Sequence, residues 1–354
     1  MRAVVLGLLA IACRGADPAE PRTVASPAAS IERRDEIVES ERGITIAFRE
    51  VIVRGHDARV AVVLVHGAGG GGVSSFDPPV AGYSLAEDLS RAGHPTYVIE
   101  VRGWGHSTRP AVLDAPPEAN PPAVLSDEAI RDIHAVVAWI RARRQRPLAI
   151  LGWATGGHWA GMYAATHPDT VSHLIMLNAI YGTPGPWSVR ARLEDADRPG
   201  ELSRSLGAYA LRDAAGLLRT WDNNIPVADK ASWRDPGVAD AYASTAVASD
   251  PTSSQRIPPS VRVPTGPLRD SYLLASGTKL WQAGDVRAAT LVIRSEHDFW
   301  SRPEDVAALQ RELTHARRLE VSTLPGATHV VFLDRPEHGR TRLLELLERF
   351  LAQD

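Results

Sequence analysis

An unbroken aliphatic run at residues 60–65, Val-Ala-Val-Val-Leu-Val, most constrains how this chain can fold. A half-buried strand alternates apolar and polar residues, whereas a run without alternation is typical of a strand buried on both faces. Further strand signals lie at residues 96–101, 148–151, 171–177 and 290–293, with helix-forming stretches between them. This alternation predicts an α/β fold with a mostly parallel central sheet and helices on both faces.

The remaining signals fill in the order of the elements. Residues 44–53 are expected to form a pair of short strands, and residues 319–322 a last one. The clearest helix spans residues 126–144, where Ser126 can cap the amino end. Further helices are predicted over residues 83–92, from the end of the 148–151 strand to about residue 166, and over residues 303–313 and 340–351.

Residues 181–289 interrupt this rhythm, because they are rich in proline, aspartate and serine and carry several tryptophans. A structureless loop of that length is improbable in a compact domain. We therefore expect a mostly helical cap, or lid, inserted into an α/β core formed by residues 41–180 and 290–354. Most of its tryptophans are expected to pack the cap itself, although some could line a pocket.

The first residues resemble a targeting signal. A basic start and a ten-residue apolar run are too short to span a bilayer and fit a secretory signal over residues 1–13. The run ends in Leu-Ala-Ile-Ala-Cys, which resembles the lipobox of bacterial lipoproteins, so Cys13 is a candidate for lipidation and a membrane anchor. A plain cleaved signal with an incidental cysteine is the alternative. Residues 14–40 are interpreted as a flexible tether.

Composition excludes several classes of function. The chain has 354 residues and a formal net charge of −3, which provides no positive field for nucleic acid. Its single cysteine excludes an internal disulfide and a cysteine-cluster metal site. The histidines show no metal-ligand spacing. We expect no metal and no cofactor.

Directly after the aliphatic run stands His66, followed by a glycine-rich run at residues 67–72. Glycines let the backbone pass close to a ligand and leave N–H groups available, as an oxyanion site requires. A phosphate-binding loop is the rival interpretation, but the Gly-Lys-Ser/Thr ending is missing. His66 is expected to be structural in this turn.

Three further positions lie beyond the carboxyl ends of predicted strands. Residues 152–156, Gly-Trp-Ala-Thr-Gly, have small residues two places either side of Ala154, which permits a sharp strand-to-helix turn. Asp298 and His329 each follow a later strand, where open α/β sheets place their sites. His158, one turn after Ala154, is interpreted as a helix-packing residue.

From about residue 43 to the end, the chain resembles the α/β-hydrolase superfamily of serine hydrolases. The resemblance includes Arg102-Gly-Trp-Gly-His-Ser107 and the order of turn, acid and histidine. It implies that Asp298 orients His329, that His329 is the general base, and that the substrate is a small acyl compound such as an ester or lactone. It also implies oxyanion donors at Thr155 and at Ala68 or Gly69. Trp153 and Trp300 could shape the pocket, with packing preferred for Trp153.

The departure from that family is Ala154, where a nucleophilic serine is expected. A methyl group cannot attack a carbonyl, so no acyl-enzyme can form there. An engineered knockout, a natural loss and a nucleophile elsewhere are the three explanations. The corresponding functions are a hydrolase scaffold that is inactive or very weak, a non-catalytic binding protein, and a His–Asp dyad enzyme without a covalent step.

Overall fold

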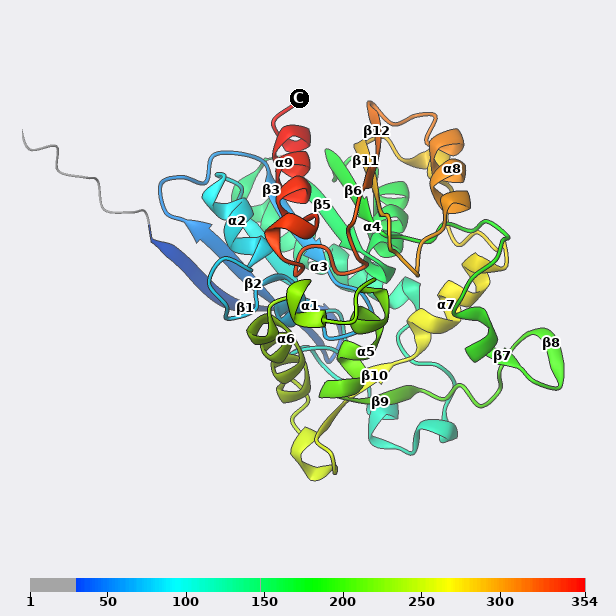
Figure 1. The fold of residues 1–354 in the computed structure, drawn as a ribbon. Coiled ribbons are helices and arrows are strands. Elements are labelled where there is room, and N and C mark those ends of the chain that lie inside the picture. The colour runs from blue at the N-terminus through cyan, green and yellow to red at the C-terminus, as the bar shows by residue number, and fades with distance from the viewer. Residues whose placement is uncertain (1–29, 147, 354) are drawn as a thin grey trace, which may run out of the picture.

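The computed structural model describes residues 30–146 and 148–353, so the predicted signal and Cys13 lie outside the described residues. An 8-stranded sheet in the order β1-β2-β4-β3-β5-β6-β11-β12 forms the centre (Figure 1). Its strands are β1 (Ile31–Glu41), β2 (Ile44–Val53), β3 (Ala61–Val65), β4 (Thr96–Ile99), β5 (Leu148–Trp153), β6 (His173–Leu177), β11 (Ala289–Ser295) and β12 (Leu319–Leu324).

All strands from β4 to β12 in this order run parallel, and only β2 runs against its neighbours. The helices of the core are α1 (Gly72–Phe76), α2 (Leu85–Arg91), α3 (Ser126–Arg144), α4 (Thr155–Thr166), α8 (Pro303–Glu312) and α9 (Arg340–Leu351). Strand β3 connects to β4 in one direction along the sheet, whereas β4 to β5 and β5 to β6 go the other way. Because such crossovers are right-handed, α2 covers one face and α3 and α4 the other. The predicted mostly parallel sheet with helices on both faces is confirmed.

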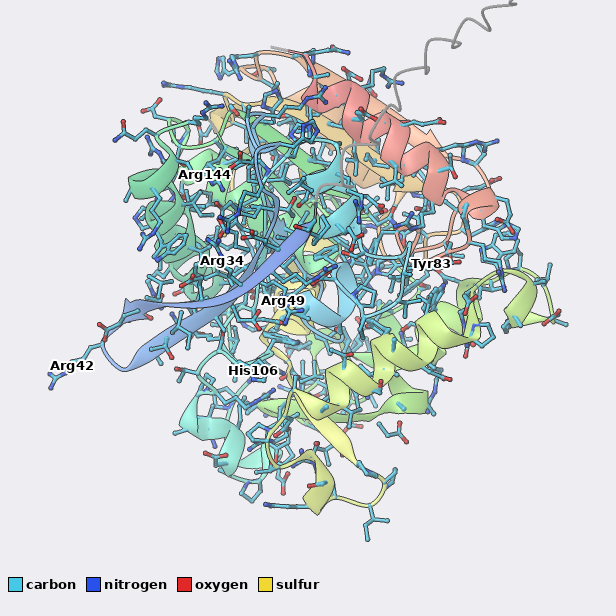
Figure 2. All side chains as sticks on the ribbon, turned by 90° about the vertical axis from the view of Figure 1, so that its left-hand side faces the viewer. Arg34, Arg42, Arg49, Tyr83, His106 and Arg144 are labelled. Carbon is cyan, nitrogen blue, oxygen red and sulfur yellow. The ribbon has the colours of Figure 1, made fainter. Side chains whose placement is uncertain are left out.

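The first strand corrects the predicted tether. The sequence predicts a flexible segment over residues 14–40, but residues 31–39 and Glu41 of β1 pair with β2, with one irregularity between Glu39 and Glu41. Its sequence is strongly charged because it is an edge strand, and its charges pair across the strands: Arg49 Nε lies 2.7 Å from Asp35 Oδ1. Arg42 extends from the hairpin tip into solvent (Figure 2). Residues 44–53 form one strand of 10 residues, not the predicted pair.

Helix α3 has the predicted bounds but a different amino-terminal cap. Leu125 is the capping residue, and its N–H donates to Glu128 Oε2 at 2.8 Å. Ser126 is the first helical residue instead. Its hydroxyl donates to Asp270 Oδ2 at 2.6 Å. The predicted cap was wrong because the Ser126 hydroxyl donates its hydrogen bond to Asp270, a residue distant in the sequence, instead of capping the helix.

Between β6 and β11 the chain forms an insert that gathers at one end of the sheet (Figure 1). Helices are its main regular structure, and short strand pairs that the sequence did not predict accompany them. Its elements are β7 (Glu194–Asp195), β8 (Arg198–Leu202), β9 (Tyr209–Asp213), α5 (Ala214–Asn224), α6 (Pro236–Ala248), β10 (Ser260–Pro264) and α7 (Gly266–Ala275). The sequence did not predict β8, β9 and β10 because none of them carries a continuous apolar run.

Single-turn 3-10 helices complete the chain: η1 (Ala111–Asp114), η2 (Pro117–Ala119), η3 (Arg190–Arg192), η4 (Lys230–Ser232), η5 (Ser253–Gln255), η6 (Ala283–Asp285) and η7 (Pro336–His338). Within residues 30–146 and 148–353, no helix has the length and apolarity needed to cross a membrane.

Two glycines let β3, β5 and α4 meet backbone to backbone. A Cβ on Gly156 would stand 2.1 Å from Val65 O, and a Cβ on Gly152 would stand 1.9 Å from Gly156 O. Neither neighbour can retreat, because both are main-chain atoms of buried elements. The spacing of small residues around position 154 is therefore a steric requirement of this crossing.

We expect Gly156→Ala to lower the free energy of unfolding by at least about 3 kcal/mol, because a main-chain clash exceeds ordinary overpacking. An alanine in a helix otherwise stabilises by up to about 1 kcal/mol relative to glycine. Urea unfolding followed by circular dichroism measures the effect. Gly284→Ala is the matched control, since its nearest neighbour there, Glu312 O, is at 3.6 Å. Equal midpoints for the two variants would contradict the steric account.

Candidate functional site

Ala154 occupies the turn between β5 and α4 in a strained backbone conformation. Its φ is 54° and its ψ is −116°. A positive φ is rare for residues with a Cβ and costs about 1–3 kcal/mol where the surroundings enforce it. Here Ala154 N–H donates to Leu177 O at 2.9 Å, and the glycine crossing holds both flanks. The turn thus presents the residue at position 154 above the carboxyl end of the sheet.

A cavity of about 460 Å³ opens over this turn, between the core and the insert. Most of the residues singled out from the sequence line it: Ala68, Gly69, Trp153, Ala154, Thr155, Trp300 and His329. Asp298 is not among the lining residues, because it lies buried behind His329. Thr155 is the first residue of α4, so its N–H has no partner four residues earlier within the helix. Its buried side-chain hydroxyl has no hydrogen-bond partner among the described residues.

Asp298 and His329 form a tight pair. The distance between Asp298 Oδ1 and His329 Nδ1 is 2.6 Å. The N–H groups of Trp300 and Ser301 also donate to the Asp298 carboxylate, at 3.0 and 2.8 Å, and the Ser301 hydroxyl donates to it as well. These donors hold the carboxylate as an acceptor and fix the ring of His329. The other ring nitrogen, Nε2, is left for chemistry in the cavity.

The loop that carries His329 is anchored through its backbone. His329 O accepts from Trp153 Nε1 at 2.8 Å and from Asn178 Nδ2 at 3.1 Å. Asn178 is buried with a φ of 53°, and its side chain also bonds both the backbone and the hydroxyl of Ser295. Asn178 is not among the residues predicted from the sequence, although it is a polar residue directly after β6 and so satisfies the criterion that found Asp298.

The insert reaches the same loop from the other side. Asp334 accepts from the backbone and hydroxyl of Thr328 and from Trp221 Nε1 of α5, the last at 2.8 Å. Asn224, the last residue of α5, accepts from His329 N–H at 3.4 Å. The position of His329 therefore depends on the insert as well as on the sheet.

The glycine run is held from below by a buried carboxyl group. Glu100, which follows β4, accepts from the N–H groups of Gly72 and Val73 at 2.7 and 2.9 Å. Burial raises the pKa of Glu100 to about 7, against the effect of these two hydrogen bonds. This residue was not singled out from the sequence, because a lone glutamate after a strand has no local signature.

His66 is structural, as expected. Its Nε2 accepts from Val101 N–H at 3.1 Å, so Nδ1 carries the proton and donates to Gly67 O at 2.7 Å. Burial lowers the pKa of His66 to about 4. Its Nε2 is 4.0 Å from Glu100 Oε2, but both groups are neutral at about pH 5–6, so this contact is not an ion pair.

His158 belongs to a buried network beneath the site rather than to the cavity. Its Nδ1 accepts from Trp281 Nε1 at 3.1 Å, and its Nε2 donates to Ser126 Oγ at 2.9 Å. That hydroxyl in turn donates a hydrogen bond to Asp270. Burial lowers the pKa of His158 to about 4. The network ties α3, α4 and α7 together.

The aromatic residues divide between packing and lining. Of the insert tryptophans, Trp221 lines the cavity, whereas Trp187, Trp233 and Trp281 pack against other rings, which agrees with the preference for packing. Phe299, which was not singled out, meets the ring of His329 edge to face at 4.7 Å. Within the described ranges, no cluster of histidine, cysteine, aspartate or glutamate could hold a metal ion.

The fold and this cavity define an α/β protein of the hydrolase type. The chain belongs to the alpha/beta hydrolase fold family, whose sequence profile matches residues 60–336. The resemblance found in the sequence is thereby confirmed at the level of family and fold.

Curated relatives match part of the chain. A 1-acylglycerol-3-phosphate O-acyltransferase from Rattus norvegicus is 32% identical over 156 residues, 43% of this chain and 37% of that protein. A (lyso)-N-acylphosphatidylethanolamine lipase from Homo sapiens is 28% identical over 184 residues, 52% of this chain and 45% of that protein. Each match spans less than half the length of the relative.

Solved structures share the fold across nearly the whole chain. A membrane phospholipase A described as a bacterial virulence factor has a TM-score of 0.57 at 17% identity, covering 92% of this chain and 86% of its own. E-2-(acetamidomethylene)succinate hydrolase has a TM-score of 0.57 at 18% identity, covering 91% of this chain and 100% of its own. At these identities the likeness shows the fold alone.

We expect Glu100→Gln to change how stability depends on pH. The carboxyl group ionises near pH 4.5 in the unfolded chain but only near pH 7 when folded, so the folded state binds more protons between these values. Its contribution to stability is present below about pH 4.5 and is lost as the pH rises to about 7. The free energy of unfolding of the native chain, minus that of the variant, should fall by roughly 2–3 kcal/mol between about pH 5 and 8.

Urea titrations at each pH provide the measurement. Taking the difference between the two proteins cancels the opposite contributions of His66 and His158, which ionise below their unfolded values. A difference that stays constant with pH would show that Glu100 is ionised in the folded state throughout.

Proposed function

We propose that this chain is an exported α/β hydrolase of the serine-hydrolase type, with Ala154 at the nucleophile position. The observation that carries the proposal is that three features distant in the sequence come together. The strained turn at Ala154, the His329–Asp298 pair and the glycine run all meet at one cavity. The substrate class we propose is a carboxylic ester, a lactone or a similar acyl compound.

With serine at position 154, each group has a role. The serine oxygen attacks the acyl carbon while His329 accepts its proton and later returns it to the leaving oxygen. Asp298 holds His329 in the required tautomer through its bond to Nδ1. Backbone N–H groups of Thr155 and of Ala68 or Gly69 stabilise the negative oxygen of the tetrahedral intermediate.

With alanine at position 154, the covalent route is closed because the methyl group offers no lone pair. Binding and oxyanion stabilisation remain. In serine hydrolases stripped of the nucleophile, these leave a residual rate of about 10³–10⁴ over the uncatalysed reaction. We therefore propose that the chain as it stands is inactive or very weak, whether serine was replaced by engineering or lost naturally.

A nucleophile elsewhere is disfavoured by the steric requirement at the turn. Thr155 would have to move to the centre, which would put Trp153 and Gly157 at the positions that must be small. The glycines lie at positions 152 and 156, symmetrically about Ala154. A Cβ added to either of them would lie within 2.1 Å of a main-chain atom. The Thr155 hydroxyl is moreover buried, which leaves it without access to a substrate in the cavity.

One alternative rests on the intact dyad. The Asp298–His329 pair could remove a proton from a water molecule, or from carbon, without a covalent step. A second alternative is a non-catalytic binding protein that uses the same cavity. The variant His329→Ala distinguishes these two alternatives, because it abolishes the activity of a dyad enzyme but leaves ligand binding by a non-catalytic protein in place.

The apolar lining and the names of the relatives both favour a lipid-like acyl group. Leucines 193, 206, 211, 217 and 268 line the cavity. The curated relatives are named for an acylglycerol phosphate and for an N-acylphosphatidylethanolamine. Apolar area of this kind binds an acyl chain by removing it from water. We propose lipase- or esterase-like specificity on this basis.

Location is a separate proposal. We propose export through residues 1–13 and lipid attachment at Cys13 in a bacterial host, on the strength of the lipobox-like sequence. Labelling with a radioactive fatty acid in such a host should mark the native chain, and should fail with Cys13→Ala. Secretion of an unlabelled native chain would instead identify a plain cleaved signal.

We expect a fluorophosphonate probe to label Ala154→Ser but not the native chain. An ester panel run in parallel should show turnover for the serine variant at least about 10³-fold above the native chain, because the nucleophile is restored to a preformed site. The double variant Ala154→Ser, His329→Ala is the control and should lose the label. If the folded serine variant neither labels nor hydrolyses any ester, the serine-hydrolase assignment fails.

A further inference from the structure

Three arginines face the cavity from the insert. Arg192 ends η3, Arg212 lies on β9 and Arg219 lies on α5, and all three line the same cavity as Ala154 and His329. They come from separate elements, so no helical or strand periodicity in the sequence brings them together. Only the packing of the insert over the sheet creates this cluster.

Among the residues that the structure describes, no side-chain hydrogen bond or ion pair involves Arg192, Arg212 or Arg219. Asp213, the acidic residue of the cavity lining, uses its carboxylate to accept from Gly216 N–H at 2.7 Å as the cap of α5. All three side chains are exposed at the cavity, whereas buried arginines elsewhere are matched with aspartates: Arg102 with Asp132, Arg262 with Asp250 and Arg302 with Asp305.

The charges are close enough to oppose one another. The pKa of Arg212 is lowered first by desolvation, and then by the positive charges of Arg192 and Arg219, with Asp213 opposing weakly. An anion in the cavity would reverse this repulsion and accept hydrogen bonds from the guanidinium groups. Guanidinium forks match carboxylate and phosphate oxygens in geometry as well as in charge.

Leucines form much of the remaining lining, and they define the other part of the ligand. Leu211, next to Arg212, is 49% exposed at the mouth, and Leu217 and Leu268 lie deeper in the lining. An exposed leucine beside unpaired arginines suits an amphiphile, with its apolar part against the leucines and its charge at the cluster.

We propose that the cavity takes an acyl compound that carries an anionic group, a phosphate or a carboxylate, and that Arg192, Arg212 and Arg219 bind that group. The acyl part of this ligand rests on the proposed hydrolase function. The anionic part rests on the arginine cluster alone.

Binding to the chain as it stands tests the inference without catalysis. Calorimetry compares two matched pairs: 1-octanoylglycerol 3-phosphate with 1-octanoylglycerol, and monooctyl succinate with methyl octyl succinate. We expect at least one anionic member to bind about 10- to 100-fold more tightly than its neutral partner, as charge-assisted hydrogen bonds of this number allow. The pair with the larger difference identifies phosphate or carboxylate, and inorganic phosphate alone tests whether the acyl part is needed.

Arginine variants assign the effect. Arg212→Gln and Arg219→Gln should each remove most of the preference for the anion while leaving the affinity for the neutral partner within about threefold. Arg141→Gln, at an exposed position of α3 outside the cavity, is the charge-matched control and should change neither. Thermal melting checks that each variant is folded. If one of the two arginine variants does not fold, the other still tests the inference.

The two proposals fail separately. If the chain prefers the anionic ligands but Ala154→Ser hydrolyses nothing, the hydrolase function falls and the anion site stands. If Ala154→Ser hydrolyses neutral and anionic esters equally, and neither anionic ligand binds more tightly than its partner, the arginine cluster is not a specificity site. A preference that Arg141→Gln reduces as much as Arg212→Gln would reflect net charge and would also overturn the inference.

Discussion

The contact on which this structure depends is the backbone crossing of β3, β5 and α4. At that crossing, Gly152 and Gly156 lie where even a methyl group would overlap main-chain oxygen atoms. The chain must reverse within the residues between them, and that reversal imposes a positive φ on Ala154. The strain is local, but the sheet and the helix that enforce it are buried and well packed, so they can sustain it. Everything else at the site is arranged around this turn.

A second layer of order comes from buried polar groups that bond to one another. Asn178 and Trp153 hold the backbone of His329, and Asp334 holds the loop while binding Trp221 of the insert. Buried donors and acceptors that are fully matched rigidify a structure, because breaking any one bond leaves a desolvated partner. An intact support of this kind around Ala154 fits a site from which one oxygen atom is missing better than one that has decayed throughout.

Charge is handled differently in the cavity than elsewhere. Buried arginines such as Arg302 are paired with carboxylates at short range. The three arginines of the cavity lining are exposed and have no carboxylate partner among the described residues, which leaves three like charges around one cavity. A site can carry such an imbalance when the ligand supplies the missing charge, and this is the basis of our inference about the ligand.

The sequence by itself determined the fold class, and it predicted the order of turn, acid and histidine and a nucleophile position occupied by Ala154. These features are local: aliphatic runs, glycine spacing and polar residues after strands each follow from a few neighbouring residues. It did not reveal β1, whose charges hid an edge strand, or the true cap of α3. Nor did it reveal Asn178, Glu100 and the three arginines as parts of one site. Those residues depend on contacts between segments distant along the chain. Only the tertiary structure brings the insert over the sheet, so that its arginines line the same cavity as Ala154 and His329.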